Sequence, residues 1–108
     1  MIYKECIDAC FDTVKAAERC AFESKGSKEC SSDMSCCITC AEICTLVGRL
    51  TARGCCTKEF YEFCAKICDD CTNKCGKMEG EHAKACAAAA KKCADVCRKC
   101  QEDCGKCD

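Results

Sequence analysis

The 108-residue sequence predicts an all-α fold, an antiparallel up-down-up-down four-helix bundle with a cysteine-lined core, formed by residues 1–108 as a single domain. The chain contains no proline and is rich in Ala, Lys and Glu, which favours helices. Three short polar or glycine-containing breaks divide it into four segments. Within these segments cysteines recur at spacings of three and four residues, which return side chains to one face of a helix.

The core of such a bundle must consist largely of cysteine. The chain has 20 cysteines, whereas Leu, Ile, Val and Phe together supply 14 residues, or 13%. So low a share of large apolar residues is typical of disordered chains. A folded chain of this composition therefore has to bury its cysteines.

The first helix is expected over residues 2–24, ahead of a polar break at residues 24–32. On this helix the stripe of residues spaced by three or four includes two points without cysteine. The stripe comprises Cys6, Cys10, Thr13, Ala17 and Cys20.

The second helix is expected over residues 32–53, with an N-cap cluster at residues 31–33 and Gly54 as its stop. Cys36 flanks its inward stripe. The stripe itself comprises Cys37, Cys40, Cys44, Val47 and Thr51.

The third and fourth helices are expected over residues 58–75 and 81–104. Thr57 is the expected N-cap of the third helix, Gly76 its stop, and Gly105 the stop of the fourth. At 100° per residue, the cysteines of the last segment fall within a stripe about 80° wide. The two stripes comprise Cys64, Cys68, Cys71 and Cys75, and then Cys86, Cys93, Cys97, Cys100, Cys104 and Cys107.

The bundle topology predicts different ligands at its two ends. Where the first and third helices end and the second and fourth begin, thiol, thioether and imidazole groups gather, which suits an entrance for a soft metal ion. His82 precedes Cys86 by four residues, although it is also an ordinary first-turn residue, and the roles of the two methionines stay open. The residues expected at this end are Cys20, Met34, Cys36, Cys37, Cys75, Met78, His82 and Cys86, and the opposite end is expected to carry a hydrophobic plug of Tyr3, Leu50, Phe60 and Phe63.

A second apolar flank lies beside the cysteine stripes of the first two helices. Two explanations stay open, namely packing between neighbouring helices and an interface between subunits. The flank comprises Ile7, Phe11, Val14, Ile38, Leu46 and Leu50.

Inward-facing thiols indicate a soft metal. Thiolates select d10 ions or iron–sulfur clusters over Mg²⁺ or Ca²⁺. Cysteines four residues apart on a helix lie close enough to chelate one ion, and one Cu(I) per thiolate leaves a buried core near neutrality. Zn²⁺ with four thiolates leaves a net charge of −2 at each site. Twenty thiols would hold on the order of 10 to 20 Cu(I) ions, a storage capacity.

The predicted copper ligands are the stripe cysteines, Cys36 and His82. The set comprises Cys6, Cys10, Cys20, Cys36, Cys37, Cys40, Cys44, Cys64, Cys68, Cys71, Cys75, His82, Cys86, Cys93, Cys97, Cys100, Cys104 and Cys107. Cys30, Cys55 and Cys56 fall in or beside loops and have no assigned role.

The alternative function is an iron–sulfur or thiol/disulfide redox protein. Cys10, Cys20 and Cys30 have the spacing of disulfide-stapled helical hairpins, but the two spacings share Cys20 and no second helix repeats them. Ferredoxin spacings are absent from the sequence. A cluster would be brown and Cu(I)-thiolate colourless, so colour separates the two functions.

Several other functions have no support in the sequence. The formal net charge of −1, with both signs interspersed, excludes the basic footprint of a nucleic-acid-binding protein. No apolar run approaches the length of a membrane span, and the N-terminus lacks a secretory signal, so a cytoplasmic location is expected. No Ser/His/Asp pattern or phosphate-binding loop is present, so the chain is not expected to be an enzyme.

The sequence resembles the bacterial copper storage proteins. The resemblance is carried by CAEICTLV at residues 40–47, FYEFCAKICDDCTNKCGK at 60–77, HAKAC at 82–86 and CADVCRKCQEDC at 93–104, with a weaker likeness in ECIDAC at 5–10. It implies a four-helix bundle that binds many Cu(I) ions, often as a homotetramer, and the start of the chain is similar to the cytosolic branch. His82 matches the family's mouth histidine by motif. The chain departs from the family pattern at Thr13, Ala17, Ala83 and Ala90, which stand at or beside cysteine points, and Cys30, Cys36, Cys55 and Cys56 are additional.

Overall fold

The structure is a computed structural model that describes residues 2–23, 31–54, 56–78 and 80–107. These residues form four helices, α1 (Ile2–Glu23), α2 (Ser31–Ala52), α3 (Lys58–Gly76) and α4 (Glu81–Cys107). Seven of the eight ends lie within one residue of the predicted bounds, and α4 runs three residues further than predicted.

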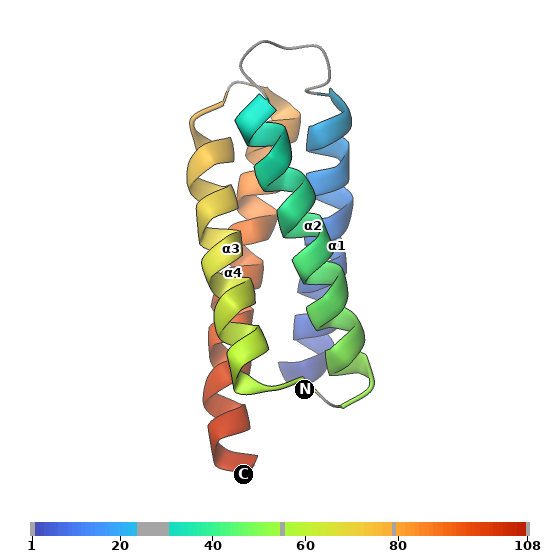
Figure 1. Cartoon of the computed structure of the whole chain (residues 1–108), viewed down its shortest axis with the longest axis vertical. Helices are drawn as coiled ribbons and strands as arrows, with labels where there is room; N and C mark the ends of the chain where they lie inside the picture. The colour runs from blue at the N-terminus through green and yellow to red at the C-terminus, as the bar shows by residue number, and fades with distance from the viewer. Residues whose placement is uncertain (1, 24–30, 55, 79, 108) are drawn as a thin grey trace.

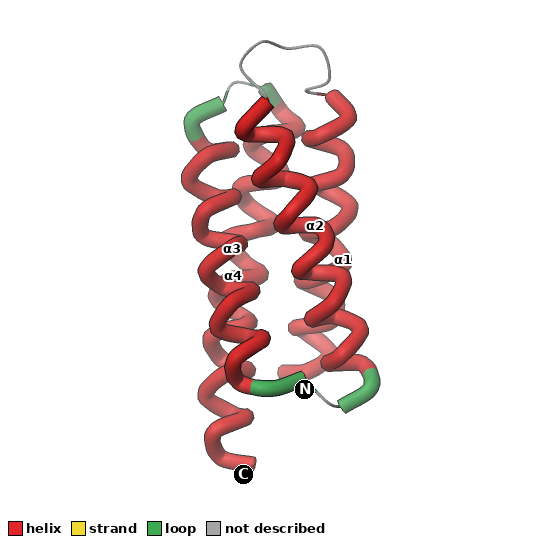
Figure 2. The backbone as a smooth tube through the Cα atoms, in the orientation of Figure 1, coloured by secondary structure: helices red, strands yellow, loops and turns green. Residues whose placement is uncertain are grey.

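The helices form the predicted antiparallel bundle. They run alternately up and down, and each packs against two neighbours in the cyclic order α1, α2, α3, α4 (Figures 1 and 2). The bundle is a narrow rod of 47 × 20 × 19 Å. Its upper end in Figure 1 joins the end of α1, the start of α2, the end of α3 and the start of α4, as the topology predicted.

The helix stops agree with the sequence in part. α3 ends at Gly76, and Gly54 follows α2 with a φ of 75°, a conformation that favours glycine. Thr57 stands at the N-cap of α3 in extended backbone, but its side chain makes no capping hydrogen bond. The expected cap cluster at residues 31–33 lies inside the first turn of α2. Gly105 does not stop α4, which continues to Cys107 because a glycine costs an α-helix only about 1 kcal/mol.

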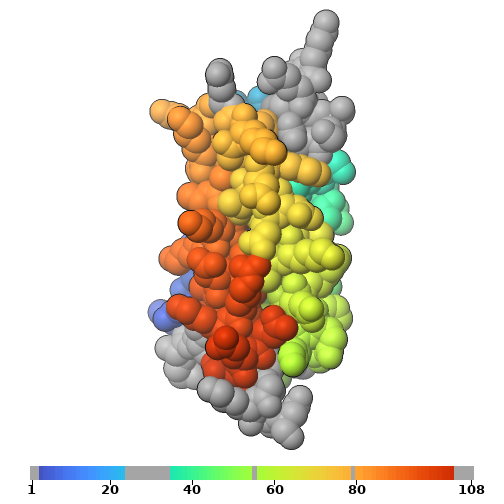
Figure 3. Space-filling view, turned by 90° about the vertical axis from the view of Figure 1, so that its left-hand side faces the viewer, coloured from blue at the N-terminus to red at the C-terminus, as the bar shows by residue number. Residues whose placement is uncertain are grey.

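Small side chains fill the core. Its buried members are mostly cysteines and alanines, and Tyr61 and Val47 are the largest fully buried side chains. This composition confirms that cysteine replaces the usual aliphatic residues. On the face seen in Figure 3, side chains of α3 and α4 cover the core along the rod.

The predicted hydrophobic plug at the lower end is wrong for Phe60 and Phe63, whereas Tyr3 packs against the core. Phe60 and Phe63 are 40% and 47% exposed, and Tyr3 and Leu50 are only half-buried. Tyr61 closes this end instead, with its hydroxyl 2.9 Å from Thr51 Oγ1. Tyr61 precedes Cys64 by three residues and Phe60 precedes it by four, so both spacings suit the inward stripe. The structure buries Tyr61 and leaves Phe60 exposed.

The apolar flank of α1 and α2 lies partly on the surface. Phe11, Ile38 and Leu46 are 37%, 42% and 41% exposed, while Ile7 and Val14 are half-buried. Packing between α1 and α2 therefore accounts for only part of this flank.

Segment Ser35–Ala52 in α2 corrects one sequence expectation. Its mean hydropathy of 1.3 makes it long and apolar enough to cross a membrane by length and composition alone, because cysteine counts as apolar. The core helix of a soluble protein passes the same test. In the bundle its cysteines face the three other helices, while Glu42 and Arg49 are exposed.

Gly48 allows α1 and α2 to approach closely. A Cβ atom at this position would lie 3.1 Å from Phe11 Cε2 and 3.2 Å from Cys10 Cβ. The half-exposed phenylalanine ring has room to move, but the Cβ atom of buried Cys10 does not.

The Gly48→Val variant is therefore expected to unfold more easily, with a free energy of unfolding lower by about 1–3 kcal/mol from overpacking. Urea denaturation followed by circular dichroism measures this loss. Gly76→Val is the control, since nothing lies within 4 Å of a Cβ atom at Gly76. A Gly48→Val variant no less stable than this control would contradict the close approach.

Candidate metal centre

The inward stripes of the four helices bring their cysteines together along the axis of the bundle. Fourteen cysteines are no more than 1% exposed, and every cysteine that the structure describes in full is a free thiol. The buried set comprises Cys6, Cys10, Cys20, Cys37, Cys40, Cys44, Cys64, Cys68, Cys71, Cys75, Cys86, Cys93, Cys97 and Cys100.

Four of these sulfurs meet near the upper end of the bundle, one from each helix. The sulfurs of this upper set all lie within 4.8 Å of one another. Cys71 joins its edge, with its sulfur 3.5 Å from that of Cys86. The upper set comprises Cys20, Cys37, Cys75 and Cys86.

Six further sulfurs form two overlapping groups lower in the bundle. Cys10, Cys64, Cys93 and Cys97 form one group, and Cys44 and Cys68 form the other with the same Cys64 and Cys93. In each group all sulfurs lie within 4.8 Å of one another. The lower set therefore comprises Cys10, Cys44, Cys64, Cys68, Cys93 and Cys97.

The spacing within both sets fits metal–thiolate bonding. A metal–thiolate bond of about 2.3 Å places two sulfurs on one ion no more than about 4.6 Å apart. The closest pair in the lower set, Cys44 and Cys68, is at 3.5 Å, and Cys10 and Cys93 are at 3.8 Å. Small rotamer adjustments are therefore enough for either set to surround ions.

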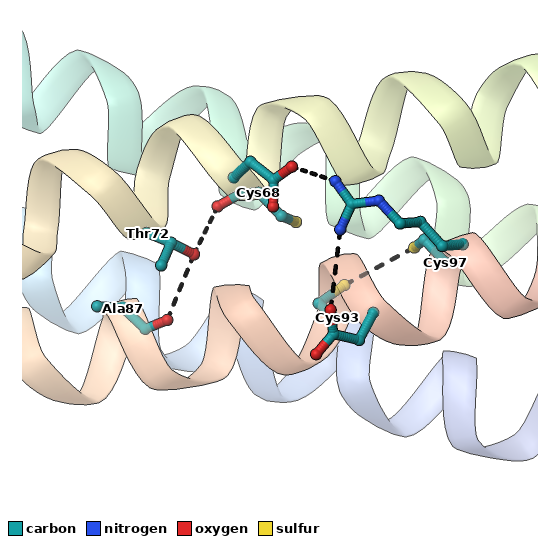
Figure 4. A network of polar contacts seen from close by, with 8 residues as sticks. Cys68, Thr72, Ala87, Cys93 and Cys97 are labelled. Carbon is teal, nitrogen blue, oxygen red and sulfur yellow. Dashed lines mark hydrogen bonds and ion pairs between the residues drawn. The ribbon is translucent and has the colours of Figure 1, made fainter.

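Threonine hydroxyls fix the helices around the lower set. Thr72 Oγ1 donates to the carbonyl oxygen of Cys68 at 2.8 Å and approaches that of Ala87 on α4 at 3.4 Å (Figure 4). The same view shows the Cys93 and Cys97 sulfurs, 4.0 Å apart on consecutive turns of α4. On the outside, Arg98 of α4 pairs with Asp69 of α3. These contacts set the register of the two helices whose sulfurs meet inside.

Thiols within each set have divergent acidities. Hydrogen bonds from Cys10, Cys44 and Cys68 lower the pKa of Cys64 to about 3. Hydrogen bonding to Cys40 raises the pKa of Cys68 above its ordinary range. In the upper set, hydrogen bonds from Cys37 and Cys71 lower the pKa of Cys75, while burial raises the pKa of Cys20 to about 12. Each set thus contains thiols whose pKa is lowered beside thiols whose pKa is raised.

The copper-free bundle is expected to lose stability in alkali, because the described thiols whose pKa is raised outnumber those whose pKa is lowered, and the two kinds act in opposite directions between pH 8 and pH 10. Cys20 illustrates a thiol with a raised pKa. The ordinary pKa of 9.0 applies to Cys20 in the unfolded chain, and the folded value is about 12. A pKa raised by folding stabilises the fold fully below pH 9, and this contribution is lost as the pH rises toward 12. At one pH unit above the unfolded pKa, such a thiol lowers the free energy of unfolding by about 1.4 kcal/mol.

Denaturant midpoints at pH 8 and pH 10 measure this effect. Copper-loaded protein is the control and is expected to show no loss over this range, because its coordinated thiolates carry no proton to lose, whereas the thiols of the unfolded chain still do. Equal midpoints for the copper-free protein at the two pH values would contradict the expectation.

The structure places other sequence-predicted residues outside the two sets. His82 is exposed at the upper end, with Nε2 3.9 Å from Glu23 Oε1, because Ala83 occupies the inward position of that turn. Cys36 and Met78 are half-buried, and Met78 packs against the core. Five further cysteines and methionines from the sequence analysis lie outside the described residues, either wholly or in their side chains. They are Cys30, Met34, Cys55, Cys104 and Cys107.

Two buried cysteines of α1 and α4 lie outside both sets. Cys6 Sγ is 4.0 Å from Cys10 Sγ and 3.9 Å from Thr51 Oγ1, which connects it to the hydroxyl of Tyr61. Cys100 is one of the neighbours whose hydrogen bonds lower the pKa of Cys6. The tyrosine that closes this end was not predicted as a site residue, although its place on the stripe of α3 was available from the spacing.

The comparisons with known proteins identify the family. The sequence model described as copper storage protein matches residues 2–108. The uncharacterized cysteine-rich protein YhjQ of Bacillus subtilis (strain 168) is 38% identical over 89 residues, which cover 78% of this chain and 82% of that protein.

Solved structures give the same result. The Cu(I)-bound copper storage protein BsCsp3 superposes with a TM-score of 0.86 at 32% identity, covering 92% of this chain and 97% of that one. The apo form of copper storage protein 3 from Bacillus subtilis gives 0.84 at 34% identity, covering 89% and 95%. Sequence, fold and buried thiols agree, and the chain belongs to the copper storage protein family.

Proposed function

We propose that this protein stores Cu(I) by binding many ions to the thiolates inside its helical bundle. The observation that most supports this function is the presence of two buried sets of cysteine sulfurs. In each four-sulfur group, all sulfur atoms lie within 4.8 Å of one another. Membership of the copper storage family and the similarity to a Cu(I)-bound structure support the same function. The proposed ligands inside the bundle are the cysteines of the four inward stripes.

Charge favours a monovalent ion in this core. Fourteen thiols are buried with no cationic side chain among the described core residues. One Cu(I) per thiolate leaves each ion and its ligand neutral, whereas Zn²⁺ with four thiolates leaves a net charge of −2. The soft thiolate set also favours Cu(I) over harder ions.

Two residues at the upper end are proposed to receive copper before it reaches the buried sulfurs. His82 and Cys36 are accessible to solvent, and His82 lies beside Glu23. An imidazole and a thiol at the rim suit a first, weaker contact with copper before it passes to the buried sulfurs. The proposed role is accordingly storage, with these residues as ligands.

The proposal includes assembly and location. The exposed apolar side chains of Phe11, Ile38 and Leu46 on α1 and α2 support a homo-oligomer, a tetramer by resemblance to the family. Free thiols throughout the described cysteines suit the reducing cytoplasm.

An anaerobic titration tests the function. Reduced, copper-free protein receives Cu(I) in the presence of a chromophoric chelator, while a thiol assay counts free cysteines. We expect the chelator to stay uncoloured until on the order of 10 to 20 equivalents are bound. Colour after one or two equivalents would overturn storage, and a brown protein after iron and sulfide addition would then favour the redox alternative.

A further inference from the structure

The upper and lower sulfur sets share no cysteine. The two groups of the lower set overlap through Cys64 and Cys93, so their ions would share ligands. The upper set draws its four sulfurs from Cys20, Cys37, Cys75 and Cys86, none of which belongs to the lower set. The four-sulfur groups of the core thus fall into two sets without a common member.

The division arises on α1 and α4. Between Cys10 and Cys20, about 15 Å apart along α1, the inward positions are Thr13 and Ala17. Between Cys86 and Cys93, about 10 Å apart along α4, the inward position is Ala90. These three spacer residues are fully buried at 0% exposure. The Thr13 hydroxyl is also engaged, at 2.8 Å from the carbonyl oxygen of Ala9 and 3.1 Å from that of Ala89.

The opposite side of the core is continuous. On α2 and α3, consecutive inward cysteines are never more than four residues, or about 6 Å, apart. Cys71 Sγ lies 3.5 Å from Cys86 Sγ of the upper set. Cys40 Sγ lies 3.9 Å from Cys68 Sγ of the lower set. Cys71 Sγ also lies 3.8 Å from Cys75 Sγ of the upper set. Buried Cys40 stands one helical turn from Cys37 of the upper set and one turn from Cys44 of the lower set, so buried cysteines continue from one set to the other on this side.

From this arrangement we propose that the core holds copper in two separate sets, and that Cu(I) passes between them by ligand exchange across a bridge formed by Cys40 and Cys71. The inference rests on the proposed function of Cu(I) storage. Each transfer exchanges one Cu–thiolate bond for another, so the ion keeps its charge and no electron moves. Thr13, Ala17 and Ala90 supply no soft ligand, and the α1–α4 side is therefore closed to such exchange.

The test removes the bridge and leaves both sets intact. In the Cys40→Ser/Cys71→Ser variant each hydroxyl has a backbone acceptor four residues earlier, as Thr13, Thr45 and Thr72 already do in this bundle. A Cys40→Ala/Cys71→Ala variant covers the case in which the serines prevent folding, since alanines are common in this core. Far-UV circular dichroism confirms that each variant is helical.

Copper uptake is then followed set by set. Protein is mixed anaerobically with excess Cu(I) for increasing times, free thiols are alkylated, and mass spectrometry of peptides reports which cysteines are protected. In the unaltered protein both sets are expected to become protected together. In the bridge variant one set is expected to become protected at least tenfold more slowly than the other. Equal protection rates for the two sets in the bridge variant would overturn the proposal.

Two further variants sharpen the result. Cys6→Ser/Cys100→Ser also removes two buried thiols, but outside both sets and the bridge. Because both are proposed ligands, this variant is expected to bind fewer ions in total, while the upper and lower sets still become protected together. Adding Thr13→Cys and Ala90→Cys to the bridge variant places thiols in the α1–α4 gap and is expected to restore fast uptake. A tenfold delay in the Cys6/Cys100 control, or a delay that persists in this folded rescue variant, would overturn the bridge.

The outcomes separate the two proposals. If the unaltered protein binds only one or two equivalents of Cu(I), storage itself fails. If the unaltered protein reaches its full capacity and the bridge variant fills both sets equally fast, only the two-set inference fails.

Discussion

The Cys64→Ser/Cys93→Ser variant is expected to bind about four fewer Cu(I) ions than the unaltered protein. This loss is roughly twice the two ions that two thiols would hold at one ion per thiol. Both sulfurs belong to both four-sulfur groups of the lower set. At one ion per thiolate, the six sulfurs of the lower set would hold about six ions. Without Cys64 and Cys93 the remaining four sulfurs form two separate pairs, each of which can chelate about one ion, so about four ions are lost. The capacity is read from the end point of an anaerobic Cu(I) titration against a chromophoric chelator.

Cys36→Ser/Cys56→Ser is the matched control for this loss. Both cysteines are half-buried, and neither belongs to a four-sulfur group. This variant is expected to lose no more than about two ions, because a thiolate that binds a single ion accounts for no more than one ion of the capacity. Equal losses in the two variants would mean that position in the sulfur network does not affect capacity.

The regular spacing of cysteines made most of the fold predictable. Steps of three and four residues identify both a helix and the face that it buries, and glycine-containing breaks mark where the chain turns. The cysteine stripe of α3 is buried as predicted, with Cys64, Cys68, Cys71 and Cys75 at 0% exposure. The fold could be predicted because one residue type marks the core of all four helices.

The ends of the stripes were harder to predict because neighbouring residues compete for one inward position. His82 and Ala83 precede Cys86 by four and three residues, so both spacings suit a helix. The structure buries Ala83 and exposes His82, since the upper end packs alanine closely and leaves the imidazole beside Glu23. Periodicity alone does not resolve this choice, which depends on the rotation of α4 against its neighbours.

Division of the sulfurs into two sets also lay beyond the spacing of single helices. Thr13 and Ala90 were visible in the sequence as points without cysteine. Their common level in the bundle depends on how far α1 is shifted along α4. The hydrogen bond from Thr13 to the carbonyl oxygen of Ala89 shows that shift directly, and only the packed bundle contains it.

Contacts between neighbouring thiols help the copper-free core to stay folded. Hydrogen bonds from Cys10, Cys44 and Cys68 lower the pKa of Cys64. No buried side-chain nitrogen or oxygen atom in the described residues lacks a hydrogen-bond partner. The buried nitrogen and oxygen atoms around the sulfurs therefore need no ion to satisfy them.

Copper loading is accordingly expected to raise the thermal unfolding midpoint by on the order of 20 °C or more without changing the helix content. An ion at a hundred times its dissociation constant adds about 2.7 kcal/mol to the folded state, and 1 kcal/mol shifts the midpoint of a domain of this size by about 4–8 °C. Far-UV circular dichroism during heating measures the midpoint and the helicity together. A strong chelator provides the copper-free form, and Ca²⁺, which thiolates disfavour, is the matched ion control. Loss of most of the far-UV signal at 20 °C on copper removal would contradict a preformed bundle, because the helices would then depend on copper for their packing.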